Sequence, residues 1–106
     1  MLYREIPRTG HKLSAPGLGT MRFKGRENVV RIVCRCLELS ANFIESAAGY
    51  GWPSAAENAD VWVGEAISGW NREELVISSN MQAELGDENP DSGLPVNACD
   101  GAWQAI

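Results

Sequence analysis

Hydrophobic side chains recur at intervals of three and four residues in two parts of the chain, and each part predicts an amphipathic helix. The first predicted helix covers residues 28–40, and its apolar stripe consists of Val29, Ile32, Val33, Cys36 and Leu37. The second stripe consists of Ala59, Trp62, Val63, Ala66 and Ile67. We expect Ser54 to cap the start of this second helix and Gly69 to end it.

Short apolar runs between turn residues predict strands. Residues 1–14 predict a hairpin that turns at Arg8-Thr9-Gly10-His11, where a glycine follows a β-branched residue. Three further strands are expected, within residues 13–20, 42–44 and 75–79. A loop over residues 45–53 is predicted after the second of these strands. After the third strand we expect a long loop over residues 82–97 and then the start of a helix at residues 98–106.

This order of elements predicts an α/β fold. Between residues 15 and 81 strands alternate with helices as β-α-β-α-β, a pattern typical of a parallel sheet with right-handed crossovers. A sheet of three strands keeps exposed edges, so we expect these residues to be part of a larger architecture.

Charge is unevenly distributed along the chain. The formal net charge is −5, which argues against a nucleic-acid partner. Residues 1–35 hold eight basic and two acidic side chains, a balance of +6, and the remainder holds one basic and twelve acidic side chains, a balance of −11. The basic third could attract a phosphate-bearing ligand, although we favour solvated arginines on helix and hairpin surfaces.

Cysteine usage argues against both a metal centre and a disulfide framework. Cys34, Cys36 and Cys99 are odd in number and lack the paired spacing of metal ligands, which fits a reducing cytoplasm. We interpret Cys36 as a core residue and Cys34 as incidental. The charged start of the chain and the absence of a long apolar run predict neither a signal peptide nor a membrane span.

Three motifs follow one another along the chain. They are Tyr3-Arg4-Glu5-Ile6-Pro7-Arg8-Thr9-Gly10, then Gly17-Leu18-Gly19-Thr20-Met21-Arg22, then Asn42-Phe43-Ile44-Glu45-Ser46-Ala47 with Tyr50-Gly51. Together they resemble the opening of a bacterial aldo-keto reductase, in register from Tyr3 to about Met81. The resemblance implies the amino-terminal portion of a (β/α)8 barrel, with a preceding hairpin, about three parallel strands and two to three helices. It places the active site at the carboxyl ends of the strands. A flavodoxin-like doubly wound sheet is the alternative fold, and the hairpin argues against it.

The resemblance also implies catalytic roles. The family's active-site tyrosine corresponds to Tyr50, its aspartate to Glu45 and its lysine to Asn80, and its histidine would lie beyond Ile106. An isolated phenol has a pKa of about 10, and a lysine ammonium beside it favours the phenolate. Asn80 carries no charge, and the carboxylate of Glu45 opposes a second negative charge. We therefore expect poor proton transfer from Tyr50.

Cofactor and substrate contacts are implied in the same way. Gly19, Thr20 and Met21 match the loop that approaches the nicotinamide ribose of NADPH, although a tight turn at the end of the strand would explain the glycine equally well. Trp52 would stand at the rim of the pocket for a small carbonyl compound, or would simply pack. His11 belongs to the hairpin turn, where we expect a surface role.

Two functions therefore remain open. The first is an NADP-dependent oxidoreductase that reduces carbonyl groups by hydride transfer, present here as a truncated, inactive segment that lacks the larger part of the cofactor site. The alternative is a non-catalytic interaction module or degenerate fragment, which would associate with itself or with a full barrel through its open sheet edge.

Overall fold

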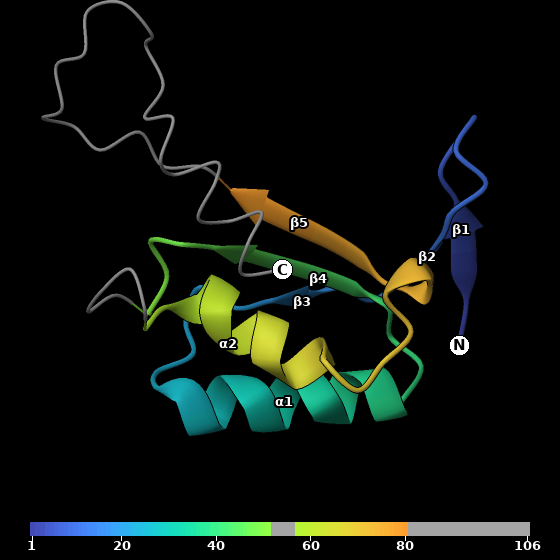
Figure 1. Ribbon diagram of the computed structural model, residues 1–106. Helices are drawn as coiled ribbons and strands as arrows, with labels where there is room; N and C mark the ends of the chain where they lie inside the picture. Colours follow the sequence, from blue (N-terminus) through green and yellow to red (C-terminus); the bar gives the residue numbers. More distant parts are fainter. Residues whose placement is uncertain (52–56, 81–106) are drawn as a thin grey trace, which may run out of the picture.

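The computed structural model describes residues 1–51 and 57–80, and they form two small sheets and two α-helices (Figure 1). The strands are β1 (Tyr3–Glu5), β2 (Lys12–Ser14), β3 (Leu18–Gly19), β4 (Phe43–Ala47) and β5 (Val76–Asn80). The helices are α1 (Arg26–Glu38), α2 (Ala59–Ile67) and the short 3-10 helix η1 (Arg72–Glu74). The loop predicted at residues 82–97 and the helix predicted at residues 98–106 lie outside the described residues.

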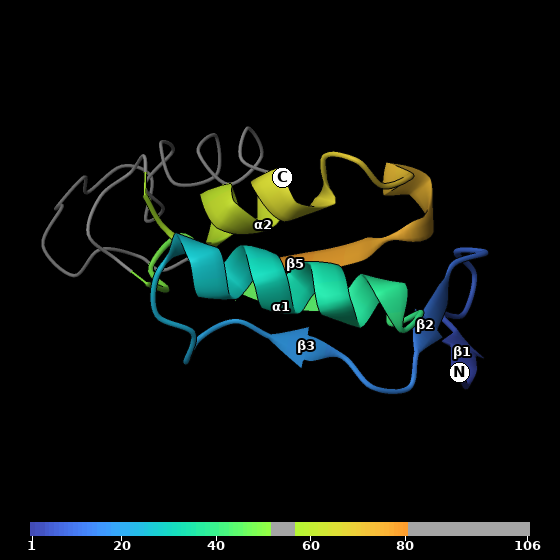
Figure 2. The same ribbon diagram turned by 90° about the horizontal axis from the view of Figure 1, so that it is seen from below.

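Strands β3, β4 and β5 form a parallel sheet in the order of the sequence. Leu18 pairs with Ile44, and Ile44 pairs with Ile77, so the three strands are in one register across the sheet. Helices α1 and α2 both lie on the same face (Figures 1 and 2). Helices cover both faces of a doubly wound sheet, whereas this arrangement is compatible with part of a (β/α)8 barrel.

The hydrophobic core lies between the two helices and the sheet. Its buried members are Val29, Val33, Leu37, Ile44, Trp62, Val63, Ala66, Ile67 and Leu75. The stripe predicted on α1 is correct at Val29, Val33 and Leu37. Its flank is different, because Cys34 packs against the core and its thiol lies 3.7 Å from the carbonyl oxygen of Ala66. The interpretation of Cys36 as the core cysteine and Cys34 as incidental was wrong, because α2 packs against the side of α1 that carries Cys34.

Helix termini differ from the prediction for local reasons. Helix α1 ends two residues early, where Ser40 adopts a positive φ of 69° and its N–H bonds to the carbonyl of Leu37 at 2.9 Å, as in a Schellman ending. Helix α2 is capped by Asn58, whose Oδ1 accepts from the N–H of Val61 at 3.3 Å. The predicted cap, Ser54, lies outside the described residues, and the prediction missed the nearer asparagine.

The predicted hairpin is present, and one asparagine connects it to the sheet. Strands β1 and β2 pair antiparallel, with Tyr3 opposite Ser14. Asn42, just before β4, accepts from the N–H of Ser14 at 2.7 Å and donates to the carbonyl oxygens of Lys12 at 2.7 Å and Glu74 at 3.1 Å. The side chain of Asn42 therefore holds β2, β4 and η1 together at the amino ends of the parallel strands.

Strand β4 is longer than predicted. Residues 45–47 were expected to open a loop, but Glu45, Ser46 and Ala47 pair with Ser78, Ser79 and Asn80 of β5. Regular pairing with β5 overrides the weak strand preference of this polar sequence. None of the helices in the described residues is long and apolar enough to cross a membrane.

Candidate functional site

The side chains of Glu45, Tyr50 and Asn80 meet at the carboxyl ends of β4 and β5. Strand alternation places Glu45 on the face opposite Ile44, and therefore away from the helices. Asn80 is the last residue of β5 and pairs with Ala47, two residues beyond Glu45. Tyr50 follows β4 by three residues. The structure thus brings together all three residues predicted to be catalytic.

Hydrogen bonds connect these three side chains directly. The phenol of Tyr50 donates to Oε1 of Glu45 at 3.1 Å. The side-chain amide of Asn80 donates to the same Oε1 and lies 3.3 Å from the phenol oxygen. Glu45 and Tyr50 are half-buried and Asn80 is exposed. We call these residues the tyrosine cluster.

The tyrosine cluster contains a negative charge and no positive one. Salt bridges in the described residues join Arg26 to Glu65 and Arg35 to Glu38, and neither involves Glu45. The only nitrogen that contacts the phenol oxygen in the described residues is the neutral amide of Asn80. Among the described residues, the phenol therefore has a donor and an acceptor beside it but no cation.

The backbone around Tyr50 is fixed at both sides. Its N–H donates to the carbonyl of Ala47 at 3.0 Å, and its carbonyl accepts from the N–H of Ala59 at 2.9 Å. The next residue, Gly51, has a φ of 64°, and a Cβ there would lie 2.6 Å from the ring of Trp62. Glycine is therefore required for this turn, and the turn directs Tyr50 toward Glu45.

The residues predicted to contact the cofactor lie beside the tyrosine cluster. Gly19 pairs with Glu45, and a Cβ at Gly19 would lie 3.5 Å from its Oε2. Thr20 is fully buried, and its hydroxyl bonds to that of Ser46 at 3.1 Å. Met21 is 58% exposed. A ligand could contact exposed Gly19 and Met21, whereas the Thr20 side chain faces the helices. Trp52 lies outside the described residues.

Sequence reasoning missed a buried polar layer behind the tyrosine cluster. Asp60 is 1% exposed, and its Oδ2 accepts from the hydroxyl of Ser79 at 2.7 Å. Ser79 precedes Asn80 and pairs with Ser46. The contact anchors the end of β5 to the first turn of α2. The only sign of this contact in the sequence is an acidic residue, Asp60, among the apolar positions of the second predicted helix.

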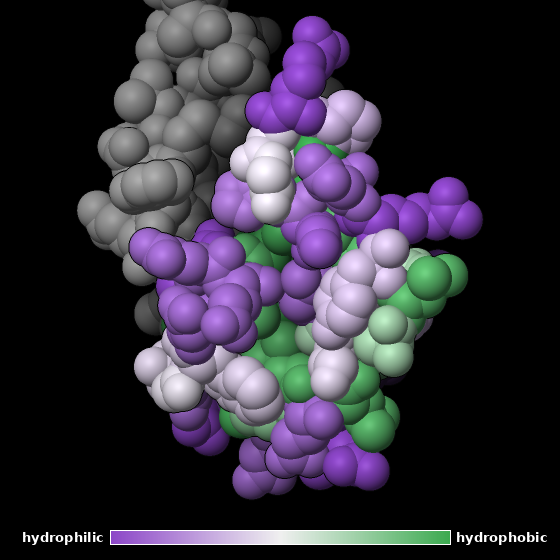
Figure 3. Space-filling model, turned by 90° about the vertical axis from the view of Figure 1, so that its right-hand side faces the viewer, coloured by the Kyte–Doolittle hydropathy of each residue, from purple (hydrophilic) through white to green (hydrophobic). Residues whose placement is uncertain are grey.

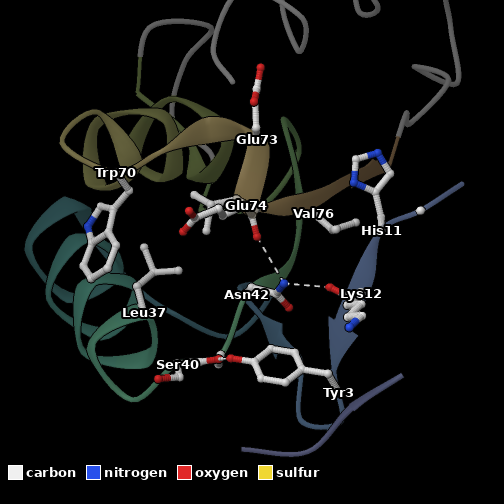
Figure 4. A pocket seen from close by; sticks show the side chains of 13 residues that line it. Tyr3, His11, Lys12, Leu37, Ser40, Asn42, Trp70, Glu73, Glu74 and Val76 are labelled. Atoms are coloured by element: carbon white, nitrogen blue, oxygen red, sulfur yellow. Dashed lines mark hydrogen bonds between the residues drawn. The ribbon is translucent and has the colours of Figure 1, made fainter. Parts of the chain in front are cut away.

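A cavity of about 510 Å³ opens at the other end of the sheet, between the hairpin and η1. Figure 3 shows an apolar hollow with polar side chains around it, and Figure 4 shows its lining. The hydroxyl of Tyr3 donates to the carbonyl of Ser40 at 2.7 Å, and Asn42 makes the contacts given above. His11 is exposed at this rim. It is therefore remote from Tyr50 and is no member of the tyrosine cluster.

Comparison with known proteins gives a structural likeness. No protein-family model and no curated protein matches the chain. Among the solved structures that match is a thermostable aldo-keto reductase, Tm1743, in complex with the inhibitor epalrestat. The two share 31% identity at a TM-score of 0.59, over 74% of this chain and 30% of that one. The chain is thus similar in fold to part of an aldo-keto reductase and spans about 30% of that enzyme's length.

Proposed function

We propose that the tyrosine cluster is the proton-donating part of a carbonyl-reducing site of the aldo-keto reductase type. The observation that carries this proposal is the direct contact of Tyr50 with both Glu45 and Asn80 at the carboxyl ends of adjacent parallel strands. Active sites of (β/α)8 enzymes lie at this end of the strands. The likeness to a solved aldo-keto reductase supports the same reading.

The proposed chemistry divides between a cofactor and this chain. NADPH, when bound, would supply the hydride that reduces the carbonyl carbon, and exposed Gly19 and Met21 are placed to contact it. Tyr50 would give its phenol proton to the carbonyl oxygen of a small aldehyde or ketone and regain a proton from solvent. Because that proton now bonds to Glu45, the substrate oxygen must compete with a carboxylate for it.

We further propose that this site is a poor or inactive catalyst in the present chain. Transfer of the phenol proton would leave a negative charge next to the carboxylate of Glu45, and like charges repel. Asn80 offers one hydrogen bond to the phenol oxygen but no positive charge to offset it. A complete barrel of the aldo-keto reductase type would make further contacts to the cofactor through its later strands and loops.

A titration of the phenol tests the proposal without the cofactor. The chain contains two tyrosines, so Tyr50→Phe isolates the signal of Tyr3. Asn80→Lys would place an ammonium against the phenol oxygen, and we expect tyrosinate to form at a lower pH than in the unmodified chain. Glu45→Gln should shift it in the same direction by removing the like charge. Ultraviolet absorbance of tyrosinate measures both.

Asn28→Lys is the matched control, because it adds the same charge at an exposed position on α1. It should leave the titration unchanged. A titration of Tyr50 that Asn80→Lys and Glu45→Gln both fail to move would sink the proposal, because the three side chains would then not act on one another.

The open sheet edge favours a second candidate function. Within the described residues β5 has one neighbour, β4, and its five residues contain neither proline nor a charged side chain. Exposed edges without such protection are prone to pair with other strands. As an interaction module, the chain would associate more as its concentration rises, and Ser78→Lys would reduce that association. Sedimentation of a concentration-independent monomer would exclude this candidate.

A further inference from the structure

A second cavity, of about 650 Å³, borders the turn that follows Tyr50. It is enclosed by the connection between β3 and α1, by Gly51 and by Trp62 of α2. Gly51 follows Tyr50 directly in the chain. The cavity therefore opens at the same end of the sheet as the proposed reducing site.

The wall of this cavity includes aromatic side chains held in place by the core. Trp62 is 6% exposed, and its ring lies under Gly51 so closely that a Cβ there would overlap it. Phe23 is partly buried and packs against the same core. These rings give the cavity a fixed apolar surface of the kind that holds the carbon skeleton of a small ligand.

The rim of this cavity carries an excess of positive charge. Arg22, Lys24 and Arg26 line it together with Glu57. Arg26 donates from Nε to Oε2 of Glu65 at 2.8 Å, and this hydrogen bond to the carboxylate raises the pKa of Arg26. Three cations against the carboxylates Glu57 and Glu65 leave a balance of +1.

Arg22 and Lys24 are the side chains free to bind an anion. Both are exposed, and neither forms a salt bridge within the described part of the chain. Glu57 already has an interaction of its own. An excess of positive charge beside an aromatic wall suits an organic anion better than a neutral molecule, because the guanidinium and ammonium groups pair with carboxylate or phosphate oxygens.

We propose that this cavity binds the anionic group of a carbonyl compound, with Arg22 and Lys24 as its charged contacts and Phe23 and Trp62 as its apolar wall. This inference rests on the proposed function, and it narrows the substrate class to aldehydes or ketones that carry a carboxylate or a phosphate. The anion would lie at the outer rim of the cavity, at the same end of the sheet as Tyr50.

Binding without NADPH tests the inference. Calorimetric titration compares 4-carboxybenzaldehyde with 4-formylbenzamide, which has the same ring and aldehyde but no charge. We expect the charged aldehyde to bind about tenfold more tightly, as two exposed ion pairs allow. Substituting Arg22→Gln and Lys24→Gln together should remove this preference. Arg31→Gln, an exposed arginine outside the cavity lining, should leave it intact.

A third probe, 4-formylphenyl phosphate, separates the two anion classes. Tighter binding than the carboxylate assigns a phosphate ester, and weaker binding assigns a carboxylate, both consistent with the inference. Equal affinity for charged and neutral aldehydes, no binding of any probe, or a preference that survives the double substitution would overturn it. If the charge preference fails while the phenol titration responds as expected, the substrate class is wrong and the proposed function stands.

Discussion

The phenol oxygen of Tyr50 lies 3.1 Å from Oε1 of Glu45, although Glu45 belongs to a strand and Tyr50 to the turn after it. They are five positions apart in the chain, and a straight extended segment would carry them apart. The turn between Ala47 and Gly51 brings them together. Its geometry depends on backbone hydrogen bonds at Tyr50 and on the positive φ of Gly51.

Gly51→Ala should therefore destabilise the protein more than a substitution that adds only backbone strain. Gly10 is the matched control, because its φ is 76° and no atom lies within 4 Å of an added Cβ. We expect Gly10→Ala to cost about 1 kcal/mol and Gly51→Ala about 1–3 kcal/mol more, from overlap with Trp62. Urea unfolding measures both. Equal losses would mean that Trp62 yields without cost.

Ser79→Ala should destabilise the protein, because Ser79 is the donor to the buried carboxylate of Asp60. The other oxygen, Oδ1, has no hydrogen-bond partner among the described residues, so the substitution leaves Asp60 without a donor there. A loss of about 1–3 kcal/mol in the free energy of unfolding is expected. Ser78→Ala, one residue earlier and without a side-chain hydrogen bond in the described residues, should change it by less than about 0.5 kcal/mol. Similar losses at both positions would contradict the role given to Asp60.

Asn42→Ala should release the hairpin from the sheet. The substitution removes an acceptor for Ser14 and donors to Lys12 and Glu74, and we expect a cost of about 2–3 kcal/mol. Amide hydrogen exchange at Ser14 should accelerate. Asn28→Ala, an exposed asparagine on α1 that does not contact the hairpin, should leave that exchange rate unchanged. Unaltered exchange at Ser14 in Asn42→Ala would show that the pairing of β1 with β2 holds the hairpin alone.

Periodicity predicted the helices well because their apolar stripes determine which face is buried. The apolar stripe does not determine which flank of α1 meets α2, because that depends on the angle between the two helices. For this reason the roles of Cys34 and Cys36 were exchanged in the prediction. An apolar stripe predicts the buried face of a helix to within about one residue. Packing against neighbouring elements decides whether the positions beside the stripe are buried.

Polar residues were harder to place than apolar ones. Glu45 and Ser46 were expected in a loop, yet backbone pairing with β5 keeps them in a strand. The contacts of Asn42 and Asp60 join segments far apart in the chain, and no local pattern indicates such partners. The structure brings together Glu45, Tyr50 and Asn80, the three residues that the family resemblance assigned to one site, because the carboxyl ends of adjacent parallel strands lie side by side. Their catalytic roles stay a prediction.

The most direct test of the central claim is the oxidation of NADPH by the purified chain in the presence of a panel of aldehydes, with Tyr50→Phe measured alongside. The account holds that the phenol of Tyr50, with Glu45 beside it and no cation against it among the described residues, is too poor a proton donor to support catalysis by this chain. It therefore predicts the same background rate for the unmodified chain and for Tyr50→Phe. A clearly faster rate in the unmodified chain, lost in Tyr50→Phe, would contradict it.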